Sequence, residues 1–108
     1  MNPQKSNTGL YYIIKTEGTG NTPNENSTIT TYYKGYNTDS ISFDESKPEG
    51  IEFKMDMLIE GFKEGMTYLK EGGEATFIIP SKLAYANSTY SALRYEVLIF
   101  DVKLINVN

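Results

Sequence analysis

The sequence predicts one α+β domain, in which about five antiparallel strands form a sheet wrapped around one short α-helix. Strong helical periodicity occurs in one stretch, residues 58–69. Several other stretches alternate apolar and polar residues, which is the period of a half-buried strand. The length of 108 residues suits one domain with one core. Because a lone helix of about ten residues is marginal in water, the helix has to pack on the sheet.

The predicted helix at residues 58–69 has one apolar face. Its apolar residues recur every three or four positions and share that face: Ile59, Phe62, Met66 and Leu69. The charged residues between them fall on the rest of the helical wheel and can face water. Gly72 and Gly73 predict the end of the helix, because glycine readily adopts the left-handed conformation of a helix C-terminus.

Five stretches are predicted to be strands, because they alternate or are rich in β-branched and aromatic residues. They are residues 9–16, 27–36, 51–57, 74–80 and 95–107. The alternation is clearest from Ile51 to Met57, where every second residue is apolar. It recurs from Leu98 to Leu104 in the last stretch, so one face of each of these strands is expected to be buried.

Polar segments precede and separate these strands. Residues 1–8 have no periodicity, so we expect a disordered tail or a remnant of cloning there and place the domain at residues 9–108. Residues 37–50 and 81–94 are predicted to be long loops, each with a short apolar piece. Loops of this kind often carry binding residues.

The composition excludes several classes of function. The chain has 14 acidic and 10 basic residues, and this net charge of −4 lacks the basic footprint of a nucleic-acid-binding protein. Without His or Cys, the usual zinc sites, thiol catalysis and serine–histidine triads are ruled out. No apolar run approaches the roughly 20 residues of a membrane span. We therefore expect no metal, no cofactor, no nucleic-acid partner and no membrane span, and we expect a monomer.

Aromatic residues are abundant, with nine Tyr and five Phe. Tyr has a large apolar body and a polar tip, which suits the wall of a half-open pocket. Several large apolar residues fall in or beside the two long loops, which suggests a shallow hydrophobic cleft. The alternative is that these side chains only complete the core and the strands.

Seven short segments follow one another in an order that is typical of one protein family. They are Tyr33-Lys34-Gly35, Phe43-Asp44-Glu45-Ser46, Ile51-Glu52-Phe53, Leu58-Ile59-Glu60-Gly61-Phe62-Lys63-Glu64-Gly65-Met66, Gly72-Gly73-Glu74-Ala75-Thr76-Phe77-Ile78-Ile79-Pro80, Leu83-Ala84-Tyr85 and Leu98-Ile99-Phe100-Asp101-Val102. They resemble the motifs of the FK506-binding-protein (FKBP) type of peptidyl-prolyl cis-trans isomerase. The resemblance covers about nine-tenths of the chain.

The resemblance implies an enzyme that turns the Xaa–Pro bond of extended polypeptide in an apolar pocket, without a covalent intermediate. Phe62 would be the floor of that pocket, and its walls would be Tyr33, Phe43, Ile51, Phe53, Leu58, Ile59 and Phe100. Tyr85 and Asp44 would be the catalytic residues: the Tyr85 hydroxyl would bind a peptide carbonyl, and Asp44 would sit at the pocket edge. Asp44 could instead be an ordinary Asx-turn residue of its loop.

The sequence departs from the family pattern around the pocket. Ala86-Asn87 follows Tyr85 where the family has Gly, Ala92-Leu93-Arg94 stands in place of Ile-Pro-Pro, and Ile51 replaces an aromatic residue. Proline restricts a loop before it binds, so a looser flap and a weaker grip on the peptide are expected.

Two other functions are consistent with the same residues. One is a catalytically weak or inactive FKBP-like module that binds peptides as a chaperone, and the other is a structural domain of unrelated use. FK506-like macrolides are candidate ligands if the resemblance holds. The Asn, Thr, Ser and Tyr content and the lack of Cys suggest the bacterial periplasm or cell envelope, with a cytoplasmic location as the alternative.

Overall fold

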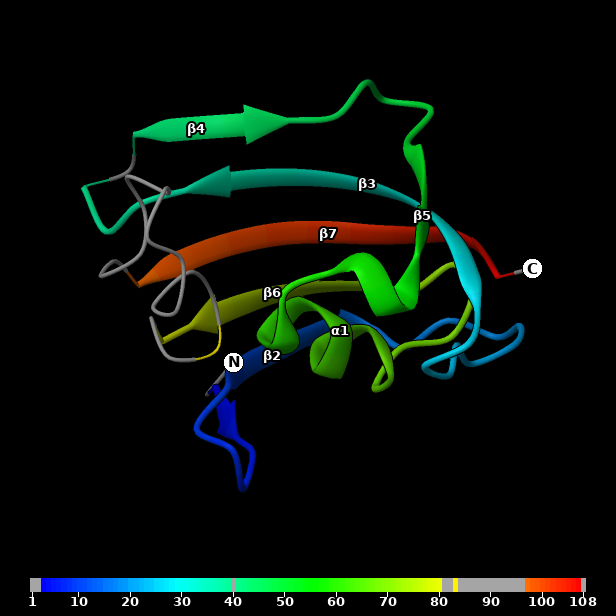
Figure 1. The fold of residues 1–108 in the computed structure, drawn as a ribbon, viewed down its shortest axis with the longest axis horizontal. Coiled ribbons are helices and arrows are strands. Elements are labelled where there is room, and N and C mark those ends of the chain that lie inside the picture. The colour runs from blue at the N-terminus through cyan, green and yellow to red at the C-terminus, as the bar shows by residue number, and fades with distance from the viewer. Residues whose placement is uncertain (1–2, 40, 81–82, 84–96, 108) are drawn as a thin grey trace.

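A twisted antiparallel sheet wraps around one short helix (Figure 1). The computed structural model describes residues 3–39, 41–80, 83 and 97–107. The strands are β1 (Gln4–Lys5), β2 (Tyr11–Thr16), β3 (Thr28–Tyr36), β4 (Ser42–Glu45), β5 (Ile51–Lys54), β6 (Glu74–Ile79) and β7 (Leu98–Val107). Between β5 and β6 come a 3₁₀ turn, η1 (Met55–Met57), and the α-helix α1 (Glu60–Met66).

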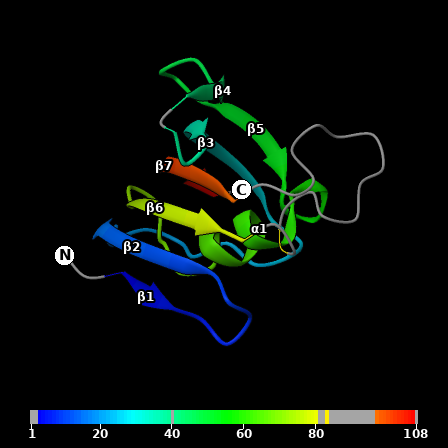
Figure 2. The same cartoon turned by 90° about the vertical axis from the view of Figure 1, so that its left-hand side faces the viewer.

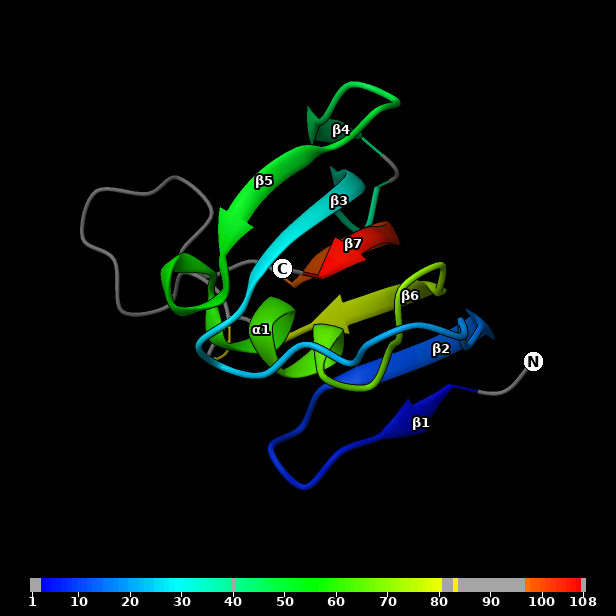
Figure 3. The ribbon, with the colours of Figure 1, turned by 90° about the vertical axis from the view of Figure 1, so that its right-hand side faces the viewer.

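The strand order is β1-β2-β6-β7-β3-β4, with every pairing antiparallel. One edge of β3 pairs with β7. Along its other edge, the first half of β3 pairs with β5 and the second half with β4. Figures 2 and 3 show the strands in this order, with α1 packed on one face. The predicted class is confirmed, and the sheet has seven strands rather than about five.

The core lies between α1 and the sheet. The inward residues of β7, from Leu98 to Leu104, are buried as their alternation predicts. Gly61 and Gly65 let α1 lie close to β6: a Cβ at Gly61 would lie 2.4 Å from Cγ2 of Ile79, and one at Gly65 would lie 2.6 Å from Cζ of Phe77. These two glycines therefore determine how closely the apolar face of the helix approaches the sheet.

The helix is shorter than predicted, because it ends at Met66 rather than at residue 69. Beyond it, the N–H of Tyr68 and of Leu69 donates to the carbonyl three residues back, at 3.1 and 3.2 Å, so the chain continues as a tighter turn. Gly72 has the expected positive φ of 88°, but it lies further along, where its N–H donates to the carbonyl of Leu104 at 2.7 Å. The glycines thus lead into β6 and do not end the helix.

The strand predicted at residues 51–57 is wrong in its second half. β5 ends at Lys54, and η1 then turns Met55 into the core while leaving Met57 77% exposed. The two methionines therefore do not share a face. The predicted loop at residues 37–50 contains β4, whose residues are polar and exposed apart from Phe43, so the strand has no apolar period that would reveal it.

Part of the segment predicted to be a disordered tail pairs with the sheet. Gln4 lies opposite Tyr12 and Lys5 opposite Tyr11, and the N–H of Ser6 donates to the carbonyl of Leu10 at 2.8 Å. Both residues of β1 are exposed, so this edge strand needs no apolar pattern. Among the described residues, none of the helices is long and apolar enough to cross a membrane.

Candidate functional site

A cavity of about 250 Å³ opens where the N-terminal end of α1 meets β3, β4, β5 and β7. Its lining is mostly aromatic and aliphatic: Tyr33, Phe43, Asp44, Phe53, Met57, Leu58, Ile59, Phe62 and Phe100. A concave, largely apolar lining with few polar groups is typical of small-ligand and peptide side-chain sites.

Phe62 forms the bottom of this cavity, with only 4% of its surface exposed. Its ring meets three others edge to face: Phe100 at a centroid distance of 5.1 Å, Phe77 at 5.9 Å and Tyr33 at 6.2 Å. Edge-to-face pairs place the positive rim of one ring on the negative face of the other, which is favourable. Phe62 is therefore held in one orientation by rings from β3, β6 and β7.

The cavity wall contains further ring contacts. The Tyr33 and Phe53 centroids are 5.9 Å apart, and Phe43 meets Phe100 edge to face at 5.7 Å. Gly35 lies beneath the second pair, because a Cβ there would be 2.7 Å from ring atoms of both Phe100 and Phe43. The missing side chain at Gly35 is what allows these two rings to approach β3.

One polar pair stands at the edge of the cavity. The Tyr33 hydroxyl donates a hydrogen bond of 2.7 Å to Oδ2 of Asp44, and the Asp44 side chain is exposed. The backbone holds this pair in register, since the N–H of Ser46 donates to the carbonyl of Tyr33 at 2.9 Å. A carboxylate has more acceptor positions than one tyrosine uses, so Asp44 can accept from a second donor.

The backbone just before α1 also borders the cavity. Ile59 is extended, with φ −61° and ψ 152°, and no side chain caps the helix there. The first N–H groups of a helix have no partner within it. In the described part of the chain, the Ile59 N–H has no backbone acceptor, whereas its carbonyl accepts from Lys63 N–H at 3.0 Å.

The structure brings together eight of the ten residues named from the sequence. Ile51 is not among them: it is 44% exposed at the end of β5 that is further from η1, two residues before Phe53. Tyr85 lies outside the described residues. Met57 lines the cavity but was missed, because the alternation from Ile51 predicted a core position; its place directly before Leu58 and Ile59 was the available signal.

Two larger hollows are less suited to an apolar ligand. One, of about 570 Å³, borders charged side chains that include Lys15, Glu74 and Lys103. The other, of about 500 Å³, lies beside α1 and is lined by Asn7, Thr8, Glu25, Glu60, Lys63, Glu64, Thr67, Tyr68 and Leu83. Most of the residues that line these two hollows are charged or polar, whereas eight of the nine residues that line the smaller cavity are aromatic or aliphatic. The smaller aromatic cavity is therefore the candidate site.

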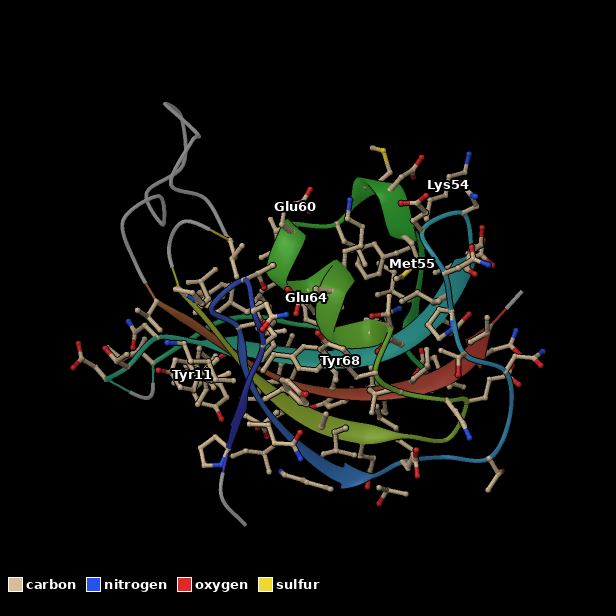
Figure 4. The ribbon with its side chains drawn as sticks, turned by 90° about the horizontal axis from the view of Figure 1, so that it is seen from below. Tyr11, Lys54, Met55, Glu60, Glu64 and Tyr68 are labelled. Carbon is tan, nitrogen blue, oxygen red and sulfur yellow. The ribbon has the colours of Figure 1, made fainter. Side chains whose placement is uncertain are left out.

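A hydrogen-bonded cluster joins the C-terminal half of α1 to the turn that follows it; Figure 4 labels Glu64 in the helix and Tyr68 in that turn. Glu64 accepts from the hydroxyl of Thr8, and from that of Tyr68 at 2.5 Å. Burial, and then the hydrogen bond to Glu64, raise the pKa of Tyr68 to about 12. For Glu64, burial acts to raise the pKa, but the hydrogen bonds from Thr8, Tyr68 and Ser6 outweigh it and lower the pKa.

Residues 19–105 match the family model of the FKBP-type peptidyl-prolyl cis-trans isomerases. The chain is 41% identical over 103 residues to the probable FKBP-type peptidyl-prolyl cis-trans isomerase FkpA of Neisseria meningitidis. The aligned region covers 92% of this chain and 38% of that protein. The crystal structure of FkpA from Escherichia coli superposes with a TM-score of 0.92 at 34% identity, covering 98% of this chain and 51% of that chain. The crystal structure of AtFKBP13 superposes with a TM-score of 0.85 at 25% identity, and each chain is covered over 100% of its length.

The family model, the curated relatives and the solved structures agree on one family. The chain spans only about two-fifths of the curated relatives it matches, between 38% of the Neisseria protein and 44% of FkpA from Buchnera aphidicola. The family model nevertheless spans α1 and the strands from β3 to most of β7, and leaves out β1 and β2. The chain belongs to the FKBP-type peptidyl-prolyl cis-trans isomerase family.

Proposed function

We propose that this chain catalyses cis–trans isomerisation of Xaa–Pro bonds in extended polypeptide, and that the aromatic cavity binds the proline ring. The observation that carries the proposal is the cavity of about 250 Å³ with Phe62 at its bottom, fixed by three surrounding rings. Membership of the isomerase family supports it. A proline ring is compact and apolar, so it suits this lining better than either polar hollow.

The reaction needs a surface that favours a twisted amide. The planar bond resists rotation by about 18–20 kcal/mol because rotation breaks its resonance, and the uncatalysed change before proline takes tens to hundreds of seconds. A twisted amide is less polar than a planar one, so an apolar, water-poor cavity stabilises it relative to the planar form. A ring held in place leaves only the preceding carbonyl free to turn. No covalent bond is made or broken.

Four groups are assigned roles in this proposal. Phe62 forms the floor under the proline ring, and the N–H of Ile59 binds a carbonyl of the peptide. Asp44 orients the Tyr33 hydroxyl or faces the turning carbonyl, and the 2.7 Å hydrogen bond between them supports a joint role. Tyr85 is assigned to a peptide carbonyl on the family resemblance alone.

A proline-peptide assay tests the proposal. The isomerisation of an Ala-Leu-Pro-Phe type peptide is followed with wild type, Phe62→Leu and Tyr85→Phe. Phe62→Leu keeps an apolar side chain, so the fold should survive while kcat/KM falls by about tenfold or more. Tyr32→Phe is the matched control, because Tyr32 lies on the other face of the sheet. A folded Phe62→Leu protein that turns the peptide at the wild-type rate would show that the pocket is assigned wrongly.

Partners and compartment complete the proposal. We propose that FK506-like macrolides compete with peptide for the same cavity, that the chain acts as a monomer, and that it works in the bacterial periplasm or cell envelope. The apolar lining supports the first point, and the similarity to bacterial proteins supports the last. Competition in the peptide assay, sedimentation of the purified chain and fractionation of producing cells test the three points separately.

A further inference from the structure

Met57 carries the apolar lining of the cavity outward into solvent. Its side chain is 77% exposed, yet it lines the cavity beside Leu58. Single exposed apolar side chains are ordinary on protein surfaces and need no function. Met57 differs from Ile41, which is 62% exposed but does not line the cavity, because part of the Met57 surface borders the candidate site.

The backbone under Met57 is anchored on both sides. η1 begins at Met55, whose side chain is fully buried and whose N–H donates to the carbonyl of Ser27 at 2.9 Å. The turn closes where the N–H of Leu58 donates to the carbonyl of Met55 at 3.3 Å. A flexible thioether therefore projects from a fixed turn. Such a side chain adapts to different apolar partners, and its sulfur makes favourable contacts with aromatic rings.

We propose that Met57 is a specificity-determining residue that contacts the side chain next to the bound proline and favours a large apolar residue there, above all an aromatic one. The inference rests on the proposed isomerase function. The charges near the cavity also favour an apolar residue over an acidic one beside the proline. None of the described lining residues is basic, Asp44 is acidic, and the exposed Asp56 directly precedes Met57. An acidic residue next to proline would therefore be disfavoured.

The test compares substrates and variants together. Proline peptides with Phe, Leu or Ala beside the proline are assayed with wild type, Met57→Ser, Met57→Leu and Ile41→Ser, first varying the residue before proline and then the residue after it. Wild type should prefer Phe to Ala, and Met57→Ser should reduce that kcat/KM ratio about two- to tenfold at one of the two positions, the size of a sulfur–aromatic contact. The change should fall mainly on KM, because the contact is present in both the ground state and the transition state.

The controls separate the possible results. Ile41→Ser should keep the wild-type ratio, and Met57→Leu, which retains an apolar side chain, should lie between wild type and Met57→Ser. If wild type turns over the peptides and Met57→Ser has the same Phe-to-Ala kcat/KM ratio as wild type at both positions, this inference is overturned. The isomerase function would remain intact. A Met57→Leu ratio as low as that of Met57→Ser would also overturn it. Absence of turnover by wild type would overturn the isomerase function, and this inference with it.

Discussion

The two faces of the sheet carry the same kind of hydrogen bond in two different surroundings. Tyr32 and Tyr33 are consecutive in β3, and Asp44 and Glu45 are consecutive in β4. The Tyr33 hydroxyl donates to Asp44 at 2.7 Å beside the aromatic cavity, whereas that of Tyr32 donates to Glu45 at 2.9 Å, beside the polar hollow lined by Lys15. One step along each strand moves the pair to the other face. The surroundings of such a pair, more than its own chemistry, therefore indicate whether it belongs to a site.

The outer face shows what the pair does without an aromatic cavity beside it. The hydrogen bond to Glu45 is the largest cause that raises the pKa of Tyr32. Nearby, Asp101 accepts from Tyr36 at 3.1 Å and from Thr76 at 2.6 Å. These bonds link β7 to its two neighbours, β3 and β6. The outer pair thus serves as a matched control for the inner one.

The largest expected difference between the faces is in stability. Phe62→Ala removes a buried ring that three other rings contact, and should lower the free energy of unfolding by about 3–5 kcal/mol. Tyr32→Ala on the outer face should lower it much less, because no cluster of buried rings is lost there. Urea denaturation of both variants measures this. Equal losses would mean that the aromatic cluster is not the main source of stability.

A second contrast separates steric from conformational roles of glycine. Gly35→Ala forces a Cβ to within 2.7 Å of two rings and should cost about 1–3 kcal/mol of stability. It should also reduce peptide turnover, because the wall of the cavity moves. Gly72→Ala has room but places Ala at a φ of 88°, so a similar loss of about 1–2 kcal/mol is expected without a change in turnover. If Gly35→Ala destabilises without affecting turnover, the ring wall is not part of the site.

A third contrast compares the two carboxylates. Asp44→Asn removes the charge at the cavity edge and should lower kcat/KM about tenfold, or roughly 1.4 kcal/mol of transition-state stabilisation. Glu45→Gln makes the equivalent change on the outer face and should leave kcat/KM within about twofold of wild type. Both variants should unfold near the wild-type urea midpoint, since exposed pairs contribute little. An equal effect of the two changes on kcat/KM would remove the distinction between the faces.

The smallest expected effect is on the pair at the far end of the helix. Because the pKa of Tyr68 rises to about 12 on folding, its contribution to stability is complete below the unfolded value of about 10 and is lost as pH rises toward 12. The lowered pKa of Glu64 acts in the opposite sense: its contribution is present above an unfolded value of about 4.3 and is lost in more acidic solution. Absorbance titration should show a tyrosine with a pKa near 12 that Tyr68→Phe removes, and a titration unchanged by that substitution would contradict the assignment.

Sequence reasoning identified the fold and most of the candidate site because both depend on patterns that can be counted. The alternation from Leu98 to Leu104 predicted the buried face of β7, and the ordered motifs identified eight of the nine lining residues. It failed at β4 and at β1, where pairing with a neighbouring strand rather than apolar periodicity stabilises the strand. It also failed at Met57, because a 3₁₀ turn changes which face a residue occupies without changing the residue types.

The position of β7 has a consequence for synthesis of the chain. This strand is the last of the domain, yet it lies in the middle of the sheet, between β6 and β3. The edges of β3 and β6 that face β7 stay unpaired until residues 98–107 are present to join them. Phe100 arrives with them, so a nascent domain has no complete aromatic cavity and depends on its final residues both to close the sheet and to recognise a peptide.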